Sequence, residues 1–176
     1  DMPLRSLSIA SHPEEEHLRF MMRTGDSSFK RSCQALVSGD LITVYGPDGE
    51  LSLRDSRSGI VFLTAGIGLT PVLPMLRELE RNGYNKPVRV ISCHHDASGI
   101  VCKEFLQKLT LPDYRYLNVL TGEKGRITRE FIKENVDYPL EYEFYVVGGT
   151  GFLKNMTGHL VALGVSREDI LTDDFG

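Results

Sequence analysis

The segment from Ile60 to Leu76, which reads IVFLTAGIGLTPVLPML, constrains the fold more than any other part of the chain. An apolar run typical of a buried strand breaks at Gly66-Ile67-Gly68, and Thr70-Pro71 then opens a pattern of helical period. A strand, a glycine turn and a helix start bring unpaired backbone N–H groups and the positive end of a helix dipole to one place. We expect Thr70 to cap the helix and Pro71 to begin it, while the two glycines allow positive φ and let a ligand approach the backbone closely. Such a place suits a phosphate group, so the first hypothesis is a nucleotide-binding turn.

The C-terminal part of the chain, residues 60–176, alternates between strand and helix patterns. Strands are predicted over 60–64, 88–92, 114–120, 143–147 and 170–172, and helices over 70–82, 98–109, 128–135 and 152–163. This alternation predicts an α/β domain with a parallel sheet and crossover helices. A second glycine turn, Gly148-Gly149-Thr150-Gly151, follows the strand over 143–147. Because ligands of such sheets bind at the carboxyl ends of the strands, both turns are candidate binding positions.

Residues 1–55 carry a different pattern, of short β segments. Strands are predicted over 4–10, 17–23, 41–45 and 50–53, with a dense turn signal at 46–49 and one short helix over 27–36. The polar stretch 55–59 is the predicted linker. The chain therefore divides into a small β domain over 1–55 and an α/β domain over 60–176.

Composition excludes several classes of function. The net charge is −4, which gives no general case for a nucleic acid or an anionic membrane as partner, and no apolar run is long enough to span a bilayer. Cys33, Cys93 and Cys102 lack metal-type spacing and suit reduced thiols in the cytoplasm. Because an iron–sulfur cluster needs four ligands, any one-electron acceptor must lie outside this chain. The adjacent His94 and His95 should point to opposite faces of a strand, so no metal site is predicted.

Six short motifs, in order along the chain, resemble the ferredoxin–NADP reductase family. They are Arg5-Ser6-Leu7-Ser8, Asp26–Arg31, Gly46-Pro47-Asp48-Gly49, Ala65–Pro71, Val147–Phe152 and Asp173-Asp174-Phe175. The resemblance covers nearly the whole chain and implies an antiparallel β-barrel domain that binds flavin, followed by an α/β domain that binds NAD(P)H. Family members carry further strands before the first motif, so we expect a partial barrel and a chain that is a fragment.

The resemblance also implies roles for individual residues. Arg5 and the backbone of Ser28, Phe29 and Lys30 would bind the flavin pyrophosphate. Leu7 stands where the family has a tyrosine that stacks on the flavin. The two predicted catalytic residues are Ser8, near the flavin nitrogen that receives hydride, and Phe175, over the flavin face that nicotinamide must reach. The predicted nucleotide-binding residues are Gly66, Gly68, Thr70, Pro71, Gly148, Gly149, Gly151 and Phe152, with Ser92 and His95 placed near the adenosine ribose.

These features together predict a flavin-dependent oxidoreductase. It would transfer hydride from NAD(P)H to FAD, which is preferred here to FMN, and pass electrons on to a ferredoxin, a flavodoxin or a sister redox subunit. No Arg or Lys lies between Ser92 and Cys102, so the sequence leaves the choice between NADH and NADPH open. The alternative is a non-catalytic nucleotide-binding regulatory or interaction module with the same fold. Leu7 and the missing barrel strands favour that alternative, and the Ala65–Pro71 motif favours the enzyme.

Overall fold

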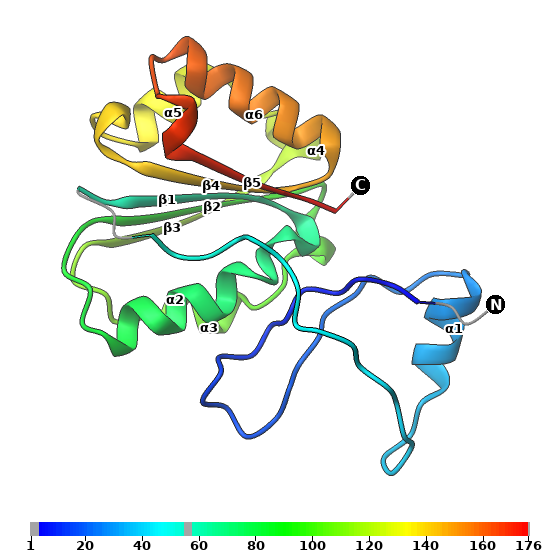
Figure 1. Ribbon diagram of the computed structural model, residues 1–176. Coiled ribbons are helices and arrows are strands. Elements are labelled where there is room, and N and C mark those ends of the chain that lie inside the picture. The colour runs from blue at the N-terminus through cyan, green and yellow to red at the C-terminus, as the bar shows by residue number, and fades with distance from the viewer. Residues whose placement is uncertain (1–3, 55–57, 176) are drawn as a thin grey trace.

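A five-stranded parallel sheet forms the centre of the molecule in the computed structural model, which describes residues 4–54 and 58–175 (Figure 1). The strand order is β3-β2-β1-β4-β5. The strands are β1 (Ile60–Ala65), β2 (Val88–His94), β3 (Tyr114–Leu120), β4 (Glu143–Gly148) and β5 (Ile170–Asp174). This arrangement confirms the predicted parallel α/β domain. All five predicted strands of the sheet are present, although four of them run on for one or two residues beyond their predicted ends.

Helices cover both faces of the sheet. Helices α2 and α3 lie on one face, and α4, α5 and α6 lie on the other (Figure 1). Their bounds are α2 (Val72–Arg81), α3 (Lys103–Lys108), α4 (Thr121–Lys124), α5 (Arg129–Asn135) and α6 (Thr150–Ala162), with short 3₁₀ turns at Gly66–Leu69, Ala97–Gly99, Pro139–Glu141 and Arg167–Asp169. The single helix predicted over 98–109 is wrong in extent. Cys102 has a φ of 54°, and this left-handed residue separates a 3₁₀ turn from the shorter α3.

The core consists of two apolar layers, one on each side of the sheet. The layer beneath α2 includes Phe62 of β1 and Tyr145 of β4, whose ring centroids are 5.1 Å apart. The opposite layer includes Phe144 and, from α6, Leu160, both fully buried. Because β1 and β4 are covered on both faces, they are apolar along nearly their whole length.

The N-terminal part, residues 4–54, extends away from the sheet and includes α1 (Ser28–Ala35) (Figure 1). The helix is confirmed, and the Ser27 hydroxyl accepts a hydrogen bond from the Lys30 backbone N–H at 3.3 Å, as expected of a cap. The strands predicted over 4–10, 17–23, 41–45 and 50–53 are wrong as regular strands. Within residues 4–54 the structure has one antiparallel bridge, between Ile9 and Phe20. A strand persists only where a neighbour pairs with its backbone, and the other segments predicted as strands in this part lack such pairing.

The predicted linker over 55–59 falls mostly on residues 55–57, which lie outside the described residues. Cys33, Cys93 and Cys102 are free thiols. In the described part of the chain, no helix is both long enough and apolar enough to cross a bilayer.

Candidate functional site

The two glycine turns lie side by side at the carboxyl edge of the sheet. One turn follows β1 and the other follows β4, and these two strands are neighbours in the sheet. The chain reverses the direction in which it adds strands at this point, because β2 and β3 lie on one side of β1 and β4 and β5 lie on the other. Such a switch point is where open α/β sheets bind their ligands.

In the first turn, Gly66 has a φ of 56°, which confirms the expectation that this position needs glycine. The residues Gly66–Leu69 form a 3₁₀ turn that leads into α2. The cap prediction for Thr70 is wrong, because its backbone is already helical (φ −52°, ψ −56°) and its hydroxyl donates to the Ile67 carbonyl at 2.7 Å. Pro71 precedes the helix instead of beginning it. The turn therefore holds itself in shape through its own hydrogen bonds.

Gly68 serves internal packing, and it does not use the positive φ that glycine allows. A Cβ atom at this position would lie 2.5 Å from the Val147 carbonyl oxygen and 3.2 Å from the Gly148 Cα. The backbone of the first turn therefore packs directly on the end of β4. Gly148 is confined less severely, since a Cβ there would lie 3.0 Å from both the Ala65 side chain and the Phe152 ring. The two turns form one packed unit.

The second turn leads into the N-terminus of α6, a helix of 13 residues. Gly149 is the cap residue. A Cβ atom added at Gly149 or at Gly151 would meet no neighbouring group within 4 Å. The Thr150 hydroxyl donates to the Asp174 carboxylate at 2.9 Å, which ties the helix start to the end of β5. Gly149, Gly151 and Phe152 all line the cleft in front of the turns. These glycines leave open space at the positive end of a helix, where an anion fits.

The structure separates Ser92 from His95, although both were expected near a ribose. Ser92 is fully buried, and its hydroxyl bonds to Thr64 at 3.1 Å and to His94 at 2.9 Å, so the prediction for Ser92 is wrong. His95 lies just beyond the end of β2, is exposed and lines the cleft. His94 is 2% exposed, and burial lowers its pKa, aided by the positive charge of Arg23 and opposed by a hydrogen bond to the Gly99 backbone. The two adjacent histidines diverge, as expected for neighbours on a strand.

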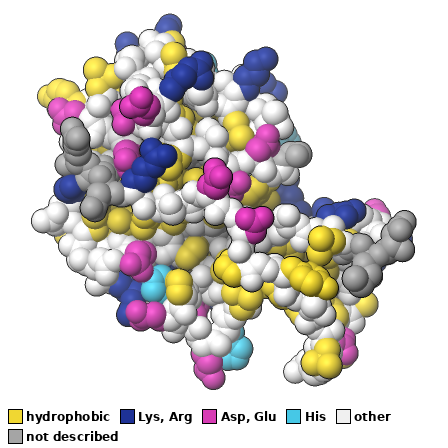
Figure 2. Space-filling view, in the orientation of Figure 1, with side chains coloured by type: hydrophobic (Ala, Val, Ile, Leu, Met, Phe, Trp, Pro, Cys, Tyr) yellow, Lys and Arg dark blue, Asp and Glu magenta, His cyan; other side chains and the backbone are white. Residues whose placement is uncertain are grey.

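The opposite wall of the cleft comes from the N-terminal part. Among the predicted flavin-binding positions, Arg5, Leu7, Ser8, Phe29 and Lys30 line the cleft, whereas Ser28 is exposed outside it. The Arg5 guanidinium donates to the neighbouring Leu4 carbonyl at 2.7 Å, and the residue is exposed. Figure 2 shows hydrophobic side chains gathered on this part of the molecule; the exposed ones include Leu41, Ile42, Val44 and Tyr45.

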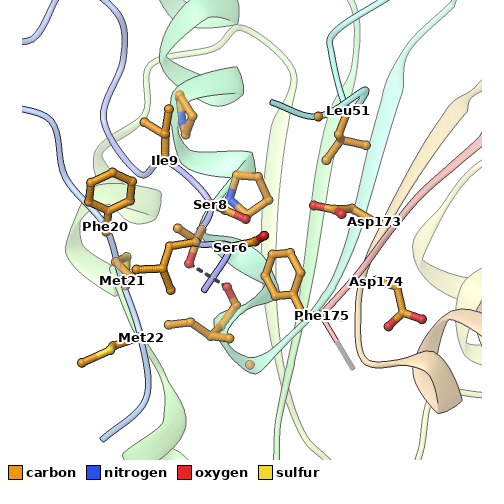
Figure 3. Close-up of a pocket in the computed structure, with 18 of the residues that line it drawn as sticks. Ser6, Ser8, Ile9, Phe20, Met21, Met22, Leu51, Asp173, Asp174 and Phe175 are labelled. Atoms are coloured by element: carbon orange, nitrogen blue, oxygen red, sulfur yellow. Dashed lines mark hydrogen bonds between the residues drawn. The ribbon is translucent and has the colours of Figure 1, made fainter. Parts of the chain in front are cut away.

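Phe175 lies between the two walls. Its backbone N–H donates to the Gly148 carbonyl at 3.0 Å, and its side chain is 37% exposed. Figure 3 shows the ring reaching from beyond the end of β5 toward Ser6 and Ser8, with Asp173 nearby. Burial raises the pKa of the Asp173 carboxyl, and the negative charge of Asp174 adds to that rise. The Phe175 ring thus faces the N-terminal wall.

Arg23 is the cleft residue that the sequence reasoning missed. A Cβ on Gly66 would lie 3.1 Å from the guanidinium carbon of Arg23 and would overlap its Nη2 atom, so the cation rests on the first turn. Among residues 4–54 and 58–175, no carboxylate forms an ion pair with Arg23. No local pattern marks this arginine, because it reaches the turn from a distant part of the chain.

The assembled cleft therefore combines two glycine turns, a helix N-terminus and the Arg23 guanidinium on one edge with Arg5, an aromatic ring and a partly apolar wall on the other. These groups can bind an anionic, elongated ligand beside a flat, partly apolar one.

Sequence comparison connects this arrangement to known proteins. No family model matches the chain. The flavohemoprotein of Pseudomonas aeruginosa is 25% identical over 181 residues, which cover 97% of this chain and 46% of that protein. One component of the Na(+)-translocating NADH-quinone reductase from the same species is 29% identical over 204 residues, covering 98% of this chain and 49% of that component. The chain spans about half the length of the curated relatives it matches.

Solved structures agree with these relatives. The flavohemoglobin of Malassezia yamatoensis with bound FAD and heme aligns at a TM-score of 0.81 with 25% identity, over 94% of this chain and 45% of that one. The chain is thus similar in sequence and in fold to these reductase-containing proteins. The ferredoxin-NADP+ reductase of Plasmodium falciparum shares the fold at a TM-score of 0.79, with 15% identity over 97% of this chain and 77% of that chain. Both alignments include the N-terminal part as well as the sheet.

Proposed function

We propose that this chain is the reductase module of a flavin-dependent NAD(P)H oxidoreductase. The observation that carries the proposal is the meeting of three features in one cleft. These are the paired glycine turns at the switch point, the wall bearing Arg5 and Ser8, and the Phe175 ring between them. The relatives support the same conclusion, since they include a component of an NADH-quinone reductase and a flavohemoglobin that contains FAD.

The nucleotide would bind at the two turns. The N-terminus of α6, kept open by Gly149 and Gly151, suits a phosphate, and the Arg23 guanidinium beside Gly66 supplies a positive charge. His95 lies where the adenosine end of the nucleotide would reach the carboxyl end of β2. The donor set on this edge therefore fits a dinucleotide.

The flavin would bind along the N-terminal wall. Arg5 offers a fork of N–H donors that matches a pyrophosphate, and the start of α1 at Phe29 and Lys30 lines the same cleft. We favour FAD over FMN because the two phosphates of FAD would give both the Arg5 guanidinium and the start of α1 a partner. The aliphatic Leu7, which is 36% exposed, would cover the ring in place of an aromatic side chain.

When bound, the flavin accepts a hydride from NAD(P)H and releases the electrons to an acceptor. The chain's own residues orient the two cofactors. Ser8 would hold a hydroxyl near the flavin edge that is reduced, and Phe175 would shield that face until nicotinamide arrives. The acceptor is proposed to be a ferredoxin, a flavodoxin or a partner redox subunit, and the free thiols Cys33, Cys93 and Cys102 suit the cytoplasm as the location.

The test is the visible absorption spectrum of the purified chain after incubation with FAD and gel filtration, recorded anaerobically before and after NADH or NADPH. The proposal predicts a retained flavin spectrum that bleaches when the nucleotide is added. A chain that binds NADH or NADPH but never retains flavin would be the non-catalytic module instead. Arg5→Ala, which should retain less flavin, is the matched variant.

A further inference from the structure

The N-terminal part is fastened to the sheet domain through a short turn. Within residues 4–54, the buried residues are Ala10, Ser11 and His12. Ala10 belongs to the apolar layer beneath α2, and its N–H donates to the Arg19 carbonyl at 2.8 Å. The Ser11 hydroxyl accepts from the Arg19 N–H at 3.0 Å. This turn is therefore the best-packed contact that the N-terminal part makes.

His12 makes the polar interactions of that contact. Its Nε2 atom lies 2.6 Å from the Glu78 Oε2 atom on α2, and its Nδ1 atom accepts from the Glu14 N–H at 3.3 Å. Its own backbone N–H donates to the Glu15 carboxylate at 2.8 Å. Every polar group of the ring is thus engaged, and His12 is only 6% exposed.

Glu78 is held in place from its own helix as well. The Asn82 side chain donates to its second oxygen at 2.7 Å. The hydrogen bonds from His12 and then from Asn82 lower the pKa of the Glu78 carboxyl, so it stays charged. A second ion pair joins Arg81, one turn further along α2, to Glu14.

The His12–Glu78 contact connects the two walls of the cleft through short segments of chain. His12 is four residues after Ser8 on the N-terminal wall. Glu78 is in α2, which begins directly after the first glycine turn. The His12–Glu78 contact therefore helps to set the distance between the N-terminal wall and the first turn, together with the Arg23 contact at Gly66.

We propose that His12 and Glu78 are a positioning pair that sets the geometry of hydride transfer, an inference that rests on the proposed function. In that reaction a C–H bond of the dihydronicotinamide breaks and its hydrogen leaves with both electrons. They form an N–H bond on the flavin, so the nicotinamide is oxidised and the flavin reduced. Neither His12 nor Glu78 touches the reacting atoms. They act by holding the Ser8 segment at a fixed separation from the turn that would hold the nucleotide.

The experiment measures the rate of flavin reduction by NADH in the FAD-loaded full chain, by anaerobic stopped-flow absorbance. Glu78→Ala and His12→Ala should each slow the step at saturating NADH by about tenfold or more, because misplacement of reacting groups by about 1 Å costs rates of that order. The double variant should be no slower than the slower single one, since both remove the same contact. Glu78→Gln keeps an oxygen that accepts from His12 Nε2, and it should recover most of the rate.

Glu104→Ala is the matched control. Glu104 is exposed on α3, and its ion pair within residues 4–54 and 58–175 is with Lys108 of the same helix, 3.6 Å away. Its loss should leave the reduction rate unchanged. A positioning role also predicts that the Kd for NADH and the retained flavin stay near those of the parent chain, whereas a partly unfolded variant would lose both.

Hydrogen exchange supplies a readout that does not depend on turnover. In Glu78→Ala the amide of Ala10 should exchange faster, while amides of β1 and β4 should keep their protection. Faster exchange with an unchanged reduction rate would overturn the inference and leave the proposed function standing. A parent chain that takes up no flavin would overturn the proposed function and the inference with it.

Discussion

Replacing Gly68 by alanine should destabilise the fold and not merely block a ligand. The added methyl group would lie 2.5 Å from the Val147 carbonyl oxygen, about 0.9 Å inside the distance at which ordinary contacts begin. Both partners are backbone, so neither can turn aside. Overpacking of this kind costs about 1–3 kcal/mol of unfolding free energy. For a chain of this size that corresponds to a fall in Tm of about 2–12 °C.

Gly151→Ala gives the contrasting case. A methyl group there meets no atom within 4 Å, and alanine is the better helix former by at most about 1 kcal/mol, so the fold should be as stable or slightly more so. Under the proposed function, the methyl group would occupy space meant for a phosphate and would weaken NADH binding. Gly158→Ala, also open and on the same helix but away from its N-terminus, is the control for helix propensity.

Differential scanning calorimetry and fluorescence titration with NADH distinguish the two turns. We expect a lower Tm for Gly68→Ala, and weaker binding without a lower Tm for Gly151→Ala. A Gly68→Ala chain that keeps its Tm and loses only NADH binding would refute the packing argument. Equal NADH affinity in Gly151→Ala and Gly158→Ala would remove the second turn from the binding site.

Three further predictions use single side chains. Arg23→Gln should weaken NADH binding by about tenfold, as expected for the loss of one charge-assisted hydrogen bond. The control Arg115→Gln, at the amino end of β3, should leave NADH binding unchanged. Equal NADH affinities in the two variants would exclude Arg23 from the nucleotide site. Arg5→Ala should lose FAD on gel filtration, and full retention would place the pyrophosphate elsewhere. Asp173→Asn should raise the Tm at pH 7. Because the pKa of Asp173 is raised in the folded state, its charged carboxylate opposes folding above that pKa. The increase in Tm should therefore vanish toward pH 3, where the carboxyl is protonated. An increase in Tm that is constant with pH would contradict this explanation.

The sheet domain was predictable because its strands are buried on both faces. Continuous apolar runs such as Ile60–Leu63 carry that information locally, and the glycines after β1 and β4 mark the strand ends. The N-terminal strands were not predictable in the same way. The alternation over Leu41–Tyr45 indicates which side chains would share a face of a strand. It does not show whether another strand is there to pair with this backbone, and in the structure Leu41 is 98% exposed.

The site was predicted in part, for a related reason. The two turns and His95 were predicted because they follow the ends of strands. That criterion does not show which face of β2 carries Ser92, and the side chain of Ser92 is buried. Ser92 and His94 share one face by the period of two, and together with Thr64 they form a buried hydrogen-bonded row. Arg23 and the His12–Glu78 contact join segments far apart in sequence, and no local pattern encodes such a pairing.

The hydrogen bond between the Phe175 N–H and the Gly148 carbonyl has a consequence for how the cleft can open. The main chain at the end of β5 is pinned to the second turn, while the ring itself is partly exposed. The ring can therefore swing aside by rotation about its own side-chain bonds, a motion of picoseconds to nanoseconds for an exposed residue. If Phe175 shields the flavin as proposed, no loop needs to unfold for the ring to move aside, and this motion would be too fast to limit turnover.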